Sequence, residues 1–99
     1  MAFQIIWSST ALEDLKGIVQ YIALDDPDAA SRLAGRIIFH IETASKLPFS
    51  NRTVPEKAQD SIREAILKPY RLIYHVDADC NVIHILRIWH AARGIPDIE

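Results

Sequence analysis

The last third of the chain, residues 61–93, constrains the fold most strongly. It contains three apolar runs, and short groups of turn-forming residues separate them. Each run is rich in β-branched and aromatic residues and is too short for an ordinary helix, which is typical of strands. Short breaks join antiparallel neighbours, because a parallel connection needs a dozen or more residues. The sequence therefore predicts a three-stranded antiparallel meander made of Ile62–Leu67, Tyr70–Val76 and Val82–His90.

A short strand and a first helix are predicted before the meander. Phe3–Trp7 is an apolar run that stops at a Ser-Ser-Thr cluster. The helix is expected over residues 11–24, since apolar residues recur there at helical spacing. Thr10 as the N-cap, with Glu13 three residues later, fits a capping box in which each side chain binds a free backbone N–H.

A second helix is predicted from Pro27 to about residue 46. Asp26 can cap this helix, and proline suits the first helical position because the N–H there needs no partner. The tight connection to the preceding helix predicts an antiparallel αα-hairpin. Gly17 and Gly35 fall inside the two helices, where glycine is costly, so the helices are expected to approach each other closely at these positions.

These elements predict one α+β domain over residues 1–99, with the order β-α-α-β-β-β. The N-terminal helical hairpin is expected to pack on one face of a mainly antiparallel sheet. Residues 48–60 contain two prolines and are expected to be irregular and exposed. The last strand carries apolar side chains on both faces, which is typical of a strand covered twice. The second face is therefore expected either to be covered by another protein chain or to form a shallow open groove.

Alternation along the strands assigns side chains to the two faces of the sheet. In the middle strand, Arg71 and His75 share one face. In the last strand, strict alternation places His90 on one face and Arg87 and Trp89 on the other. The register between strands cannot be read from the sequence. Whether the basic residues near the end of the chain form a cluster therefore stays open.

Two interpretations of the basic residues Arg71, Arg87, His90 and Arg93 follow. They could form a clamp for phosphate or carboxylate, because the arginine fork matches both groups. His90 would then make acid–base chemistry on RNA conceivable. Alternatively, the arginines pair with carboxylates of this chain or of a partner, and His90 caps the edge of the sheet.

Composition argues against several classes of function. A formal net charge of -2 does not suit a protein whose whole surface binds nucleic acid. With three glycines in all, the chain has no glycine-rich phosphate loop. The N-terminus lacks the features of a signal peptide, and no apolar run approaches the ~20 residues of a membrane span. A cytoplasmic protein that does not contact membranes is therefore expected.

The cysteine and histidine content does not predict a metal site. Cys80 is the single cysteine, so no disulfide can form within the chain. His75 and His84 could face each other across the hairpin, but a metal site needs three or four ligands in fixed geometry. The chain has no CxxC or HxxxH spacing. Neither a metal ion nor a cofactor is predicted.

Three motifs in this order resemble the RelE/ParE superfamily of toxins from bacterial type II toxin–antitoxin modules. The matching segments are ALEDLKGIVQYIALDDPDAASRL at residues 11–33, YRLIYHVD at 70–77 and VIHILRIWHAAR at 82–93. Together they span nearly the whole chain apart from residues 48–60. The resemblance implies the same β-α-α-β-β-β order that the periodicity predicts. It also implies an antitoxin whose C-terminal segment covers the helices and the sheet.

The resemblance implies one of two activities. RelE-like toxins cut mRNA in the ribosome, whereas ParE-like toxins poison DNA gyrase and are not known as nucleases. Arg71 matches a position shared by both branches, but the strand before it lacks the lysine pair of the ribonuclease type. The acidic tail at 94–99 has no tyrosine or lysine to act near a scissile phosphate. The favoured prediction is therefore a toxin that inhibits growth by acting on DNA gyrase and that a cognate antitoxin neutralises.

Two alternatives remain, a ribosome-dependent mRNA endoribonuclease and a non-toxic antitoxin-binding domain. In the ribonuclease alternative, the ribosome and mRNA replace gyrase as partners, and the catalytic residues would be Arg71, His90 and Arg93. A dimer or a toxin–antitoxin hetero-oligomer is the expected assembly. The residues expected to contact protein partners are Leu15, Ile22, Arg63, Arg71, Arg87, Trp89, His90 and Arg93.

Overall fold

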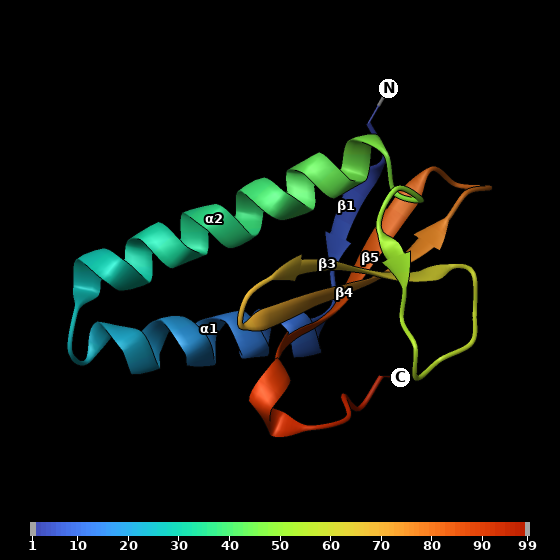
Figure 1. Ribbon diagram of the computed structural model, residues 1–99. Helices are drawn as coiled ribbons and strands as arrows, with labels where there is room; N and C mark the ends of the chain where they lie inside the picture. The colour runs from blue at the N-terminus through green and yellow to red at the C-terminus, as the bar shows by residue number, and fades with distance from the viewer. Residues whose placement is uncertain (1, 99) are drawn as a thin grey trace.

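In the computed structural model, which describes residues 2–98, two helices lie against one face of a five-stranded sheet (Figure 1). This is the predicted α+β arrangement, with one further strand inside the segment that was expected to be irregular. The helices are α1 (Ser9–Ala23) and α2 (Pro27–Lys46). The strands are β1 (Gln4–Trp7), β2 (Arg52–Thr53), β3 (Ile62–Leu67), β4 (Tyr70–Asp77) and β5 (Val82–His90), and the short 3-10 helix η1 (Ala91–Arg93) follows β5.

The strands lie in the order β1-β5-β4-β3-β2. Strands β3, β4 and β5 form the predicted antiparallel meander, and β2 continues it antiparallel to β3. Strand β1 pairs in parallel with β5, and the αα-hairpin provides the long connection that follows β1. The meander therefore occupies the middle of the sheet, and β5 has a neighbour on each side for its first half only.

The start of α1 differs from the prediction. Ser8, not Thr10, is the N-cap, and its side-chain oxygen accepts a hydrogen bond from the backbone N–H of Ala11. The Ser8 hydroxyl also donates to the carbonyl of Leu86 in β5. This second contact ties the first turn of α1 to the sheet, which explains why the helix begins two residues earlier than predicted. The predicted cap of α2 is confirmed, since Asp26 accepts from the N–H of Ala29 and proline occupies the first turn.

The predicted role of the two helical glycines is wrong. A methyl group placed on Gly17 or Gly35 would have no neighbouring atom within 4 Å, so neither glycine allows a close helix contact. Both lie on the exposed surface of the hairpin. The hairpin packs into the core through larger side chains instead, among them Leu15, Ile18 and Leu33.

The main core lies between the helical hairpin and the sheet. Ile37 of α2 and Tyr74, Leu72 and Ile85 of the sheet are almost completely buried there. Burial of a large apolar side chain contributes about 1.5–3 kcal/mol, so this layer is the largest source of stability. The buried Tyr74 hydroxyl is hydrogen-bonded within this core, because it donates to the carbonyl of Pro48 at 2.6 Å.

A second, smaller core lies on the opposite face of the sheet. Val54 from the segment after β2 and Ile98 from the C-terminal tail pack against Ile62, Ile73 and Trp89. The expectation that this face has no cover from the chain itself is therefore wrong at the centre of the face. Towards β1 the face stays open, and it contains a cavity of about 440 Å³. Three apolar side chains, two histidines and three other polar side chains line this cavity: Ile6, Ile62, Leu86, His75, His84, Ser8, Lys57 and Gln59.

A β-bulge in β5 changes the predicted alternation. Ile73 pairs with Arg87 and Tyr74 pairs with Ile85, so Leu86 has no partner in β4. Before the bulge, odd-numbered residues of β5 face the helices, and after it even-numbered residues do. As a result His90 faces the helices and Trp89 faces away, because their partners Tyr70 and Arg71 do so.

Candidate functional site

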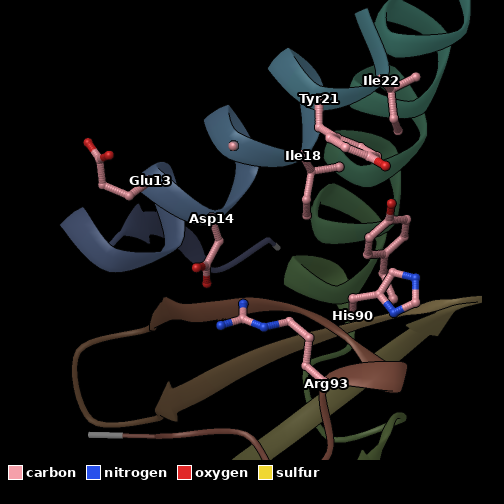
Figure 2. Close-up of a pocket in the computed structure, with 9 residues that line it drawn as sticks. Glu13, Asp14, Ile18, Tyr21, Ile22, His90 and Arg93 are labelled. Carbon is pink, nitrogen blue, oxygen red and sulfur yellow. The ribbon is translucent and has the colours of Figure 1, made fainter. Parts of the chain in front are cut away.

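A cavity of about 430 Å³ opens between α1 and the C-terminal end of β5 (Figure 2). Its helical wall combines acidic and apolar side chains, and its opposite wall carries an imidazole, a phenol and a guanidinium group. The lining residues are Glu13, Asp14, Gly17, Ile18, Tyr21, Ile22, Tyr70, His90 and Arg93. Tyr21 is 78 % exposed, which is unusual for an aromatic side chain on a small protein. This cavity is the strongest candidate for a functional site.

The position of His90 follows from the register of β4 and β5. His90 is opposite Tyr70, and the two rings contact each other edge to face with centroids 5.3 Å apart. The Nδ1 atom of His90 accepts a hydrogen bond from the backbone N–H of Ala92 at 3.1 Å and so caps η1. Burial raises the pKa of the Tyr70 hydroxyl. His90 is thus held in place by one hydrogen bond and one aromatic contact.

Asp14 connects α1 to the free edge of β5, beyond the end of β1. Its carboxylate accepts from Nε of Arg87 at 2.8 Å and from Nη2 of Arg87 at 2.9 Å. It also accepts from the backbone N–H of Ile88 at 3.1 Å. The hydrogen bond to Asp14 raises the pKa of the Arg87 guanidinium. Arg87 is therefore committed to a contact within the chain.

Trp89 is buried on the face opposite the helices, and two arginines stack on it. The guanidinium carbons of Arg87 and Arg93 lie 4.8 Å and 4.2 Å from the centre of its ring. The indole N–H donates to the carbonyl of Gly94 at 3.1 Å, which holds the start of the C-terminal tail. Arg93 is exposed, and within residues 2–98 it has no ion-pair partner.

Arg71 lies apart from this group, in an ion-pair network of its own. Its Nε donates to the buried carboxylate of Glu64 at 2.6 Å, and its two terminal nitrogens donate to Glu56 at 3.0 and 2.7 Å. Glu64 also accepts from Arg52. The pKa of Arg71 is raised, chiefly by Glu56, and Arg71 in turn lowers the pKa of the Glu56 carboxyl. The Nε atom and both terminal nitrogens of Arg71 therefore all donate to carboxylates of this chain.

The structure brings some of the predicted site residues together and separates others. Ile22, His90 and Arg93 line the cavity. Arg87 and Arg93 share the ring of Trp89. Arg71, His90 and Arg93 do not lie together in one site, because Arg71 and His90 lie on opposite faces of the sheet.

Leu15 and Arg63, two further residues predicted to bind partners, are both engaged within the chain. Leu15 is half-buried against the main core. Arg63 binds the segment before it, donating to the backbone carbonyls of Phe49 and Asn51 and to Asp60. Arg63 therefore fastens residues 49–60 to the sheet.

Several cavity residues were not among the predicted site residues. They are Glu13, Asp14, Gly17, Ile18, Tyr21 and Tyr70. Gly17 and Tyr21 carried a usable signal, because a glycine in a helix and an aromatic residue one turn later lie on the same helical face. Neither residue packs inside the chain, and together they mark the exposed wall of the cavity.

A family model described as "ParE toxin of type II toxin-antitoxin system, parDE" matches residues 5–95. The chain belongs to the ParE toxin family. The match covers both helices, η1, strands β2 to β5 and all of β1 except Gln4, so the family assignment and the observed fold concern the same part of the chain.

Two relatives of this ParE-family chain are similar over nearly their whole length. One is "Toxin RelE2" of Caulobacter vibrioides, which is 36 % identical over 90 residues that span 91 % of this chain and 97 % of the relative. The other is "Putative toxin Y4kP" of Sinorhizobium fredii, which is 35 % identical over 97 residues, or 96 % of this chain and 95 % of the relative. The first relative carries the RelE name, whereas the matching family model carries the ParE name.

Two solved structures have the fold of this ParE-family chain. A chain of the chromosomal ParDE toxin–antitoxin system of P. aeruginosa superposes with a TM-score of 0.71 and 22 % identity, covering 90 % of this chain and 96 % of that one. A chain of the toxin–antitoxin complex RelBE2 of Mycobacterium tuberculosis gives 0.69 and 20 %, covering 91 % and 92 %. Neither helix within residues 2–98 is long and apolar enough to cross a membrane.

Proposed function

We propose that this ParE-family toxin inhibits growth by acting on DNA gyrase and that a cognate antitoxin neutralises it. The alternative branch of the superfamily is the ribosome-dependent ribonuclease. The observation that favours gyrase is the pairing of the arginines on the sheet. Arg71 is bound by two carboxylates and Arg87 by one, so neither is free to hold a scissile phosphate.

The separation of Arg71 from His90 also supports this proposal. A general acid or base must lie within hydrogen-bonding reach of the reacting group. Arg71 faces the second core, whereas His90 faces the helices and contacts Tyr70. The sheet therefore lies between a candidate phosphate ligand and a candidate acid. A binding toxin needs no such arrangement, since it acts through surface contacts.

The antitoxin is proposed to cover the apolar outer surface of the helical hairpin. Large apolar side chains are exposed there, and Tyr21 and Leu24 are the most exposed of them. Exposed apolar patches commonly mark protein interaction sites. The solved P. aeruginosa and M. tuberculosis relatives come from toxin–antitoxin systems. The exposed large apolar residues of the hairpin are Leu12, Tyr21, Leu24, Ile38 and Phe39.

The experiment for gyrase is a supercoiling assay with the purified chain. The chain is expected to inhibit supercoiling, and its antitoxin, added in equal amount, is expected to restore it. Arg93→Gln removes the exposed arginine of the cavity and should weaken inhibition, whereas Arg36→Gln on the exposed surface of α2 is the matched control. A folded wild-type chain that leaves gyrase unaffected would contradict the proposal.

One observation keeps the ribonuclease as a second candidate. His90 and Arg93 line the same cavity, and Arg93 has no ion-pair partner within residues 2–98. This candidate predicts new mRNA 5′ ends in translated regions after induction of the chain. It also predicts that His90→Gln abolishes both the cleavage and the growth arrest. Growth arrest without new mRNA ends would remove it.

A further inference from the structure

Two histidines lie side by side on the open part of the sheet face that the helices do not cover. His75 of β4 and His84 of β5 are direct partners in the antiparallel register. Their ring centres are 6.1 Å apart, and the ring planes are inclined by 40°. Both side chains are half-buried, and both line the mouth of the cavity of about 440 Å³ near β1.

Neither imidazole is used elsewhere in the part of the chain that the structure describes. Within residues 2–98, no hydrogen bond or ion pair involves the ring of His75 or His84. The other two histidines differ, because the Nδ1 atoms of His40 and His90 lie 2.9 Å and 3.1 Å from backbone partners. The paired histidines therefore keep their ring nitrogens available on a rigid sheet.

We propose that His75 and His84 form a chelating pair for a transition-metal dication such as Zn²⁺ or Ni²⁺. An ion bound to two imidazole nitrogens at about 2.0–2.1 Å holds the ring centres about 5–6 Å apart. The observed separation of 6.1 Å is therefore close to the separation that a shared ion requires. Since both backbones are paired in the sheet, the two ligands are organised before the ion arrives.

The surroundings decide which ions this pair can take. No group of three or more His, Cys, Asp or Glu side chains is placed to hold an ion within residues 2–98, so the two histidines are the protein ligands and water molecules would supply the third and fourth ligands that a zinc site needs. Imidazole ligands suit zinc, copper and nickel, whereas magnesium and calcium prefer oxygen ligands. Lys57 is the charged residue that lines the cavity beside the pair, and its ammonium group weakens binding of a cation.

The proposed site is independent of gyrase inhibition. It lies on the face opposite α1 and shares no residue with the cavity that contains His90 and Arg93. Substitutions of His75 or His84 are therefore expected to change metal affinity without changing the cavity that contains His90 and Arg93. If the histidine pair does not bind a metal ion, the proposed action on gyrase is unaffected.

The test is calorimetric titration of the untagged chain with Zn²⁺ and with Ni²⁺. One ion per chain is expected to bind. Because changes even to groups outside the coordination shell cost about 10–100-fold in metal affinity, His75→Gln and His84→Gln should each weaken binding at least about tenfold. His40→Gln is the matched control and should bind as the wild type does. Mg²⁺ should give no heat of binding.

A second variant makes the test independent of folding defects. Lys57→Met keeps both histidines and removes the neighbouring positive charge, so it should strengthen Zn²⁺ binding. NMR spectra of the imidazole nitrogens should show that His75 and His84 change on addition of Zn²⁺ while His40 does not. Equal affinity in the wild type and both histidine variants, or a response confined to other histidines, would overturn the proposal.

Discussion

Replacing Asp14 with asparagine is expected to destabilise the chain by about 2–4 kcal/mol. Asp14 accepts two hydrogen bonds from Arg87 and one from the backbone of Ile88. The side chains of Arg87 and Asp14 are only 14 % and 10 % exposed. Removing one partner of a buried ion pair costs about 3–5 kcal/mol, and the retained amide oxygen and partial exposure reduce that figure here.

The assay is equilibrium unfolding in urea or by heat. For a domain of this size, 1 kcal/mol corresponds to a fall of about 4–8 °C in the melting temperature, so Asp14→Asn should melt at least ~8 °C lower than the wild type. Asp60→Asn is the matched control, since Asp60 also pairs with an arginine but its side chain is 85 % exposed. Exposed ion pairs contribute about 0–1 kcal/mol, so the control should change little.

The result that would refute this reasoning is an equal, small effect of both substitutions. It would mean that water satisfies Arg87 when the carboxylate is lost. Arg87 would then be available to a partner, and it could bind a phosphate group despite its pairing with Asp14. A double-mutant cycle with Arg87→Met gives the coupling energy directly and separates the pair from the hydrogen bond to Ile88.

Three further predictions concern other contacts. Tyr74→Phe removes the donor to the buried carbonyl of Pro48 and should cost about 1–3 kcal/mol in urea unfolding, because that acceptor loses its partner. Arg71 lowers the pKa of Glu56 below its ordinary value of 4.5, so Glu56 stabilises the fold above that pH. The stability difference between wild type and Glu56→Gln should shrink as the pH falls below 4.5. Gly17→Ala should raise stability by about 0.5–1 kcal/mol in thermal unfolding, since the added methyl group meets no atom.

The meander could be predicted because its strands are marked by local signals. Lys68-Pro69 and the turn after Asp77 interrupt runs of β-branched and aromatic residues, and the structure places β3, β4 and β5 between those breaks. The cap of α2 at Asp26 is equally local. Local signals suffice where a residue's role depends on its near neighbours in sequence.

Features that depend on contacts between distant residues could not be predicted. Ser8 outcompetes Thr10 as the cap of α1 because its hydroxyl also reaches the carbonyl of Leu86, 78 residues away. The pairing of Arg71 with Glu56 likewise requires the segment after β2 to fold over the sheet. Composition shows that such carboxylates exist, but not which arginines they bind.

The single residue inserted at the bulge in β5 has the largest consequence for function. Strict alternation from His84 would place His90 on the face of Arg71, and would place Trp89 under the helices. With Leu86 unpaired, the assignment reverses after the bulge: His90 contacts Tyr70 below α1, and Trp89 lies opposite Arg71. A phosphate ligand and an acid–base group on one face would have suited a ribonuclease. The bulge separates them and places His90 in the cavity between α1 and the end of β5.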